Sequence, residues 1–438
     1  MGVQSIANEK GSWWFPDTLE RTTGTLSFEP TSGSELKLDK LILPQMWPPA
    51  FTWPVILGEL VDGTPITLLR PVMQGGKMTV DGSGTTADAL LSSGLVLYGA
   101  HLASSDEFLI ARASVCLDGL RQLCTTPAIV DDQLVRFVAS DGTGPAERIV
   151  AVPGARMTFR LTSDDDVELE LELDEGQRLE DFEERWLVQI QGLVILAGND
   201  PTVVKRVAVL DHDHGPVEVL MRLPGLAAEP RWKHERPLVP FAALGDGAPA
   251  FIGGWFELYE NLGPAMLFFI AALSERMFLE NRLLNATSFA ESYHRTLHDK
   301  PPITPDEHTE YMARMLETVE NADHRKHYEA RLRFAATQGQ RQRLKWLIRR
   351  AKATLPKLTV LKVGLADDLV DTRNALTHLD PTGPAGLSGG PLFRSIELLE
   401  VALQLNILLD LGVEPGLAET LFDVCYYRRT PFIDIPGE

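Results

Sequence analysis

Apolar and polar residues alternate with a period of two along much of the first half of the chain. Val167–Leu173 reads Val-Glu-Leu-Glu-Leu-Glu-Leu, which gives a strand one apolar and one acidic face. Further runs rich in apolar and β-branched residues are separated by turn residues. They predict strands at Thr25–Phe28, Leu36–Leu43, Pro54–Leu60, Pro65–Leu69, Gly94–Leu102, Glu107–Cys116, Val203–Leu210 and Val217–Leu223.

Three pairs of these runs are close enough in sequence to form hairpins. The first pair is Pro54–Leu60 with Pro65–Leu69, and the second is Gly94–Leu102 with Glu107–Cys116. The third is Val203–Leu210 with Val217–Leu223. Leu179–Leu196 is compatible with either a helix or a strand. We therefore expect residues 1–245 to form a mainly β, sandwich-like domain.

The periodicity changes to that of helices after a cluster of proline and glycine at Pro237–Gly254. A helix should begin at Thr304-Pro305-Asp306-Glu307, where a threonine cap precedes a proline and two acids. Gly412 should end one helix and Pro415 begin the next. The helices expected from spacing are Ala265–Ser288, Phe289–Leu297, Leu344–Leu355, Leu361–Leu379, Leu392–Leu411 and Gly416–Arg428. The fold class is thus α+β, with an all-α domain at residues 246–438.

Charge is distributed unevenly along the 438 residues, whose net charge is −20. Residues 1–250 hold 36 acidic and 20 basic residues (−16), and residues 251–438 hold 25 and 21 (−4). Within the second part, Arg325–Lys352 has ten Lys/Arg against one acid, a basic block that could neutralise phosphates or form a solvated helix face.

The remaining composition excludes several classes of protein. The three cysteines are odd in number and contain no CxxC pair, which argues against a disulfide framework and a cysteine zinc site. We expect no metal and no cofactor. The N-terminus lacks a basic segment followed by an apolar one, and the longest apolar run, Pro264–Leu273, is too short to span a bilayer. We therefore expect a soluble, cytoplasmic protein with no membrane partner.

The helix expected at Leu361–Leu379 carries the most informative residues. Leu361, Leu365, Leu369, Thr372, Leu376 and Leu379 form one stripe at helical spacing. The sequence Asp371-Thr372-Arg373-Asn374-Ala375-Leu376-Thr377-His378 lies at the end of this helix, because Pro381 disfavours helical geometry at Asp380. Arg206–His212 has a similar Arg–His spacing, but it lies in a β-like run and Val207 follows the arginine.

This segment resembles the R-x(4–6)-H signature of HEPN domains, with a polar residue after the arginine. The Trp-rich opening and the strands of the first half resemble the N-terminal domain of ApeA anti-phage HEPN proteins. The resemblance implies an endoribonuclease that acts as a homodimer, is restrained until a phage-derived trigger acts, and damages the translation machinery, with tRNA as a candidate target. It also implies a bacterial, cytoplasmic protein.

The resemblance assigns catalysis to Arg373, Asn374 and His378. Arg373 would bind the phosphate, His378 would transfer a proton, and Asn374 would position His378 or a phosphate oxygen. Arg373 and His378 lie about 140° apart around an ideal helix, so an unwound last turn or a second copy must bring them together. Residues expected to support the catalytic ones are Asp371, Thr377, Glu291 and His294. Residues expected to bind RNA are Arg341, Arg343, Lys345, Arg349 and Arg350.

Two alternatives remain open from the sequence. One is a non-catalytic HEPN module that binds RNA or protein. The other is a sugar-binding β domain in which Trp13, Trp14, Trp47 and Trp53 line a groove, although these side chains also suit a β core. Asp211-His212-Asp213-His214 contains metal-ligand types but fits a polar turn before Gly215-Pro216 better.

Overall fold

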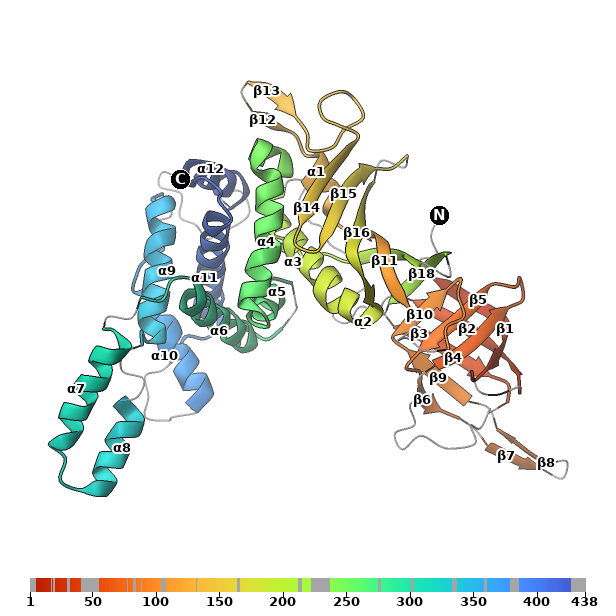
Figure 1. The fold of residues 1–438 in the computed structure, drawn as a ribbon, viewed down its shortest axis with the longest axis horizontal. Helices are drawn as coiled ribbons and strands as arrows, with labels where there is room; N and C mark the ends of the chain where they lie inside the picture. The colour runs from red at the N-terminus through yellow and green to blue at the C-terminus, as the bar shows by residue number, and fades with distance from the viewer. Residues whose placement is uncertain are drawn as a thin grey trace. The chain divides into compact units, whose positions relative to one another are not determined.

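The computed structural model divides the chain into two compact units, Met1–Phe256 and Glu257–Glu438. The first is a large antiparallel sheet with a few helices and the second is helical, which confirms the α+β class (Figure 1). The division falls within α4 (Ala248–Leu262), later in the chain than the boundary expected after residue 245. The structure describes residues 5–16, 18, 20–29, 32–40, 55–76, 78–81, 84–87, 89–103, 108–130, 132–163, 166–211, 215–221, 237–274, 277–300, 303–332, 337–357, 361–378 and 386–426.

Fourteen strands of the first unit form one continuous sheet in the order β14-β15-β16-β11-β17-β18-β10-β5-β4-β1-β2-β3-β9-β6. This single hydrogen-bonded sheet takes the place of the two packed sheets that a sandwich would have. The strands are β1 (Ile6–Trp14), β2 (Thr22–Glu29), β3 (Gly33–Leu38), β4 (Val55–Leu60), β5 (Pro65–Leu69), β6 (Val72–Gly75), β9 (Ala89–Ser93), β10 (Leu95–Tyr98), β11 (Leu109–Leu117), β14 (Glu147–Val152), β15 (Ala155–Leu161), β16 (Val167–Arg178), β17 (Val204–Asp211) and β18 (Gly215–Met221). Two small hairpins are separate: β7 (Met78–Asp81) with β8 (Gly84–Ala87), and β12 (Ala128–Val130) with β13 (Gln133–Val135).

Two of the three expected hairpins are confirmed. β4 pairs with β5, and β17 pairs with β18. The expected pairing of Gly94–Leu102 with Glu107–Cys116 is wrong, because β10 pairs with β5 and β18 while β11 pairs with β16 and β17. Both strands lie inside the sheet and take their neighbours from distant parts of the chain. Residues 41–54 and 212–214, which include Trp47, Trp53 and most of the Asp-His turn, lie outside the described residues.

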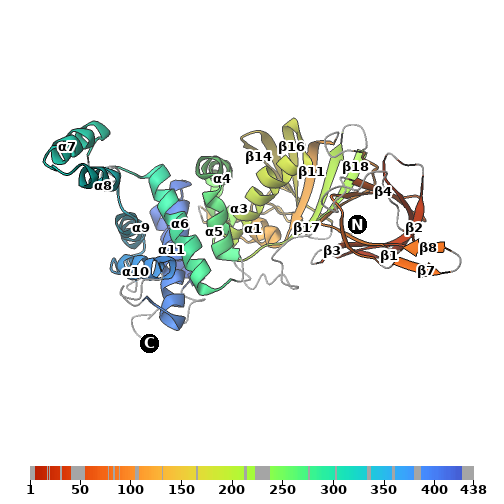
Figure 2. The same cartoon turned by 90° about the horizontal axis from the view of Figure 1, so that it is seen from below.

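Strands β1 to β5 curl around an apolar core in which Trp13 is fully buried (Figure 2). Two glycines make room for its ring. A Cβ on Gly58 would lie 2.1 Å from Cζ3 of Trp13, and one on Gly24 would lie 3.1 Å from its Cδ1. Trp14 is 9% exposed and stacks under the guanidinium of Arg21, 3.9 Å from the ring centroid. The two tryptophans therefore belong to the packing of the sheet, and neither forms an open groove.

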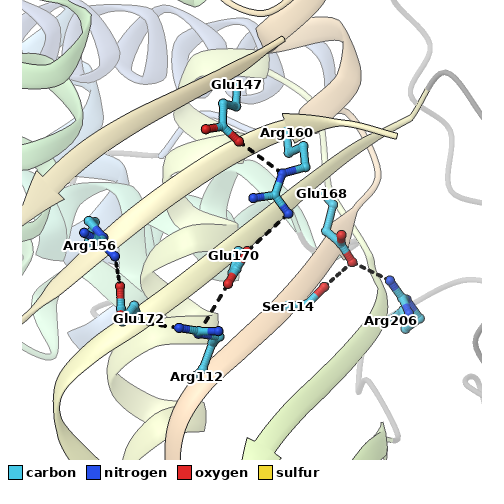
Figure 3. A network of polar contacts seen from close by, with 9 residues as sticks. All are labelled: Arg112, Ser114, Glu147, Arg156, Arg160, Glu168, Glu170, Glu172 and Arg206. Atoms are coloured by element: carbon cyan, nitrogen blue, oxygen red, sulfur yellow. Dashed lines mark hydrogen bonds and ion pairs between the residues drawn. The ribbon is translucent and has the colours of Figure 1, made fainter. Parts of the chain in front are cut away.

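The alternating sequence of Val167–Leu173 forms β16 as expected. Its valine and leucines are buried on one face, and its glutamates form a network of ion pairs on the other (Figure 3). Glu170 pairs with Arg112 and Arg160, while Glu168 pairs with Arg206. The glutamates of this alternating segment are thus neutralised by arginines of β11, β15 and β17. Arg206, the alternative arginine for an R-x(4–6)-H motif, is part of this network.

Leu179–Leu196, ambiguous from sequence, is helical. It forms α2 (Leu179–Phe182), a π-helical turn (Glu183–Leu187) and α3 (Val188–Gly198). Figure 1 shows these helices beside β14–β16, together with α1 (Leu120–Thr125). A 3-10 helix, Phe241–Gly247, leads into α4, where the indole N–H of Trp255 donates to the carbonyl of Gln189 at 2.8 Å. Part of the proline and glycine cluster at Pro237–Gly254 is therefore helical.

The second unit is a bundle of helices after α4. Thr304 caps its helix as predicted, and the structure adds a capping box with Glu307. Gly412 has a φ of 84°, and Pro415 begins the last described helix, as predicted. The helices are α5 (Ala265–Ser274), α6 (Leu279–Leu297), α7 (Pro305–Glu317), α8 (Ala322–Leu332), α9 (Gln340–Thr354), α10 (Leu365–His378), α11 (Gly389–Asp410) and α12 (Pro415–Tyr426). Among the described residues no single helix is both long and apolar enough to cross a membrane; the bent pair Phe241–Leu262 and Ala265–Leu273 meets both criteria together.

Candidate functional site

Helix α10 positions the motif residues, and it is shorter than expected. It begins at Leu365, because residues 361–364 form a turn in which the N–H of Leu365 bonds the carbonyl of Lys362 at 3.0 Å. The apolar stripe is nevertheless present. Leu361, Leu365, Leu369 and Thr372 are buried and Leu376 is half-buried, whereas Leu379 lies outside the described residues. One face of α10 is thus fixed in the bundle.

Arg373 and Asn374 lie together near the end of α10. Both are half-buried, and Nη1 of Arg373 donates to Oδ1 of Asn374 at 3.3 Å. Thr377 is exposed and its hydroxyl donates to the carbonyl of Arg373 at 2.9 Å. His378 is the last residue of α10, and its side chain lies outside the described part of the structure. Its approach to Arg373 stays a prediction.

Three ion pairs join α9 to α10 just before the motif. The guanidinium of Arg341 donates to Asp367 and to Asp371, each at 2.6 Å, and Lys345 lies 2.8 Å from Asp367. Hydrogen bonds from Lys345 and Arg341 lower the pKa of Asp367 below its usual range. A network of this kind holds its members more firmly than isolated surface pairs. Asp371 therefore connects α10 to α9.

Two other basic residues of α9, Arg343 and Arg350, also have acidic partners. Arg343 is 1% exposed and binds Asp299 at 2.9 Å, so in this conformation it cannot reach a phosphate in solvent. Arg350 binds Asp410 at 2.6 Å, whereas Arg349 is exposed. RNA binding by the α9 cations stays a prediction.

Glu291 and His294 lie on α6 and have different neighbours. Glu291 forms an ion pair with Arg295 one turn along. His294 is fully buried, and its ring meets that of Trp346 edge-on with centroids 4.9 Å apart. Neither ring nitrogen of His294 has a hydrogen-bond partner among the described residues. Burial, followed by the charges of Arg343 and His298, lowers the pKa of His294 to about 4.

A neighbouring network was not predicted from the sequence. Nε2 of His298 lies 2.8 Å from Asp410, which also accepts hydrogen bonds from Tyr293 and Arg350. Burial alone would raise the pKa of Asp410, but these three hydrogen bonds outweigh it and lower that pKa. The partners come from α6, α9 and α11, so no local spacing in the sequence indicates the network.

We expect the His294→Phe variant to become more stable relative to the wild type as the pH is lowered. The folded-state pKa of His294 is about 4, below its ordinary value of 6.5. Between these values the unfolded chain binds a proton that the folded chain does not, so wild-type stability falls as the pH is lowered through this range. Thermal unfolding of both proteins at about pH 7 and about pH 5 measures the effect. A Tm difference independent of pH would contradict it.

Thr372 joins α10 to the chain that follows the motif. Its buried hydroxyl donates to the carbonyl of Asp368 at 2.7 Å and accepts from the N–H of Leu387 at 2.9 Å. Gly386 packs directly on it, since a Cβ there would lie 3.1 Å from Cα of Thr372. The chain that leaves α10 at His378 thus returns to the residue preceding Arg373. The sequence indicated that Thr372 is buried, but not this second bond.

The described residues contain no group of three or more His, Cys, Asp or Glu side chains arranged to hold a metal ion. Cys124 is buried and Cys116 half-buried, both as free thiols, while the side chain of Cys425 lies outside the described residues. Burial raises the pKa of both described thiols.

A β-rich unit is followed by a helical bundle, in which an Arg-Asn-x3-His segment ends a helix with one buried face, as expected of a two-domain HEPN protein. Comparison with protein families agrees with this class. Residues 284–417 match the Apea-like HEPN family, and residues 8–134 match ApeA N-terminal domain 1. The chain therefore belongs to the ApeA-type HEPN proteins. Searches of curated proteins and of solved structures found no match.

Proposed function

We propose that this chain is an endoribonuclease of anti-phage defence that cleaves RNA without a metal ion. The family matches support a HEPN nuclease-like defence protein. The observation that carries the finer proposal is the position of Arg373 and Asn374, in contact with each other near the end of α10, with His378 as its last residue.

In the proposed reaction the 2′-OH of the RNA attacks the adjacent phosphorus, and the bond to the 5′-oxygen breaks. His378 transfers a proton, because an imidazole titrates near neutral pH. Arg373 binds the phosphate and balances the charge that develops on it. The products are a 2′,3′-cyclic phosphate and a 5′-OH. DNA lacks the attacking hydroxyl and is not a substrate for this route.

The proposed active form is a homodimer in the cytoplasm, with RNA as substrate and tRNA as a candidate target. A second copy would supply the facing motif that one regular helix cannot complete, since residues five apart point about 140° away from each other. A phage-derived trigger would release the activity. The acidic first half would restrain it until the trigger acts, so residues 246–438 alone should be more active or toxic than the full chain. Equal activity of the two would remove this regulatory part of the proposal.

The chemistry is tested with the purified full chain and total cellular RNA in EDTA, followed by mapping of the new RNA ends. Cleavage should persist in EDTA and leave cyclic phosphate and 5′-OH ends. A substrate with a 2′-deoxy nucleotide at the mapped position should resist cleavage there. Cleavage that requires added metal, or that leaves 5′-phosphates, contradicts the mechanism. If even lysate from phage-infected cells elicits no cleavage, the chain is a non-catalytic HEPN module.

A further inference from the structure

Helices α7 and α8 form an arm that projects from the helical unit. Figures 1 and 2 both show the two helices side by side and extending away from α9 and α11. α7 contacts α8, and neither helix has a comparably extensive contact with another described element. α8 contains no buried residue, and every residue of α7 whose burial is described is half-buried or exposed. The arm thus gains little stabilisation from the rest of the unit.

The arm exposes large side chains. Tyr311 is 51% exposed, Met315 56% and Tyr328 50%. Tyr311 and Met315 are one turn apart on α7 and lie along one edge of the half-buried stripe that begins at His308. Helices of 11 to 13 residues are marginal in water unless a packed face stabilises them. The exposed side chains provide a face for a partner to cover.

The charges of the two helices are complementary. α7 has four acids (Asp306, Glu307, Glu310 and Glu317) and one arginine, a net charge of −3. α8 has Arg325, Lys326 and Arg331 against two acids, a net charge of +1, together with two histidines. Two arms related by a two-fold axis can place each α7 against the other α8. Opposite charges then meet on both sides, and the exposed Tyr and Met side chains lie between the helices.

We propose that the α7–α8 arm binds the same arm of a second copy of this chain, with α7 of each copy against α8 of the other. The same charges disfavour RNA as the occupant, because residues 305–332 together hold seven acids and four Lys/Arg. This inference gives the proposed homodimer a specific contact surface. The test measures the molecular mass of the protein in solution, so its outcome does not depend on whether the protein cleaves RNA.

The experiment compares two charge-reversed forms of the full chain by sedimentation equilibrium. The α7 form carries Glu310→Lys and Glu317→Lys, and the α8 form carries Lys326→Glu and Arg331→Glu. All four side chains are exposed. The wild type should dimerise, and each form alone should dimerise at least about tenfold more weakly because like charges then face each other. An equimolar mixture should recover the wild-type affinity, since α7 of one form again meets opposite charge on α8 of the other.

The matched control reverses two exposed acids outside the arm, Glu280→Lys and Glu414→Lys, and should leave the dimer affinity unchanged. A wild type that stays monomeric overturns the proposal. So do charge-reversed forms that dimerise like the wild type, which would place the interface elsewhere, and a mixture that fails to recover. Loss of RNA binding in the α8 form without a change in mass would identify RNA as the occupant and equally overturn it.

Discussion

Replacing Arg373 or His378 by alanine is expected to lower the rate of RNA cleavage by about 10²–10⁴-fold. The arginine would stabilise charge on the phosphate in the transition state, and the histidine would carry the proton, so neither role can be taken over by water at a comparable rate. Asn374→Ala should have a smaller effect, because its side chain contacts Arg373 and would act by positioning. The measurement is the single-turnover rate on the RNA identified by end mapping.

Lys362→Ala is the matched control for these variants. Lys362 is exposed in the turn just before α10, so its removal also deletes a charge close to the helix without touching the motif. It should cleave at the wild-type rate. Circular dichroism of each variant establishes that α10 and its surroundings remain folded. Cleavage that survives both Arg373→Ala and His378→Ala would mean that other residues perform the reaction.

Gly58→Ala is expected to destabilise the first unit by about 1–3 kcal/mol or more. The added Cβ would lie 2.1 Å from Cζ3 and 2.2 Å from Cε3 of Trp13, whose ring is fully buried and cannot turn aside. Thermal unfolding of the full chain measures the loss. In combination with Trp13→Leu, which removes the obstructing ring, the glycine substitution should cost less than it does in the wild-type background.

Gly75→Ala is the control for this comparison, since nothing lies within 4 Å of a Cβ built at that position in β6. It should change the free energy of unfolding by no more than about 0.5 kcal/mol. An equal effect of Gly58→Ala in the presence and absence of the Trp13 ring would show that steric conflict with the ring is not the cause.

Local patterns in the sequence predicted much of the fold. The alternation in Val167–Leu173 identified β16, and the cap at Thr304 identified the start of α7, because both depend on neighbouring residues alone. Pairing of β10 and β11 was mispredicted because their partners, including β16 to β18, lie far along the chain. Leu179–Leu196 stayed ambiguous, since a helix buried over much of its surface has no polar face to reveal its period.

For the site, the sequence located the helix and its buried stripe but not the partners of its charged residues. From the sequence, the basic block that includes α9 could either neutralise phosphates or form a solvated helix face. In the structure Arg343 is buried against Asp299, and Arg341 binds two acids of α10. These partners lie far from the block in the sequence. Charge along a chain reports how many cations are present, whereas packing determines which of them remain accessible.

The bond between Thr372 and Leu387 has a consequence for protein engineering. Both anchors lie outside residues 379–385, so a peptide inserted in that segment would lengthen a connection whose two ends are already held. The entropic cost of a longer loop grows slowly, by about 0.6 kcal/mol for each doubling. A reporter tag added in this segment should therefore leave the preceding helix in its position.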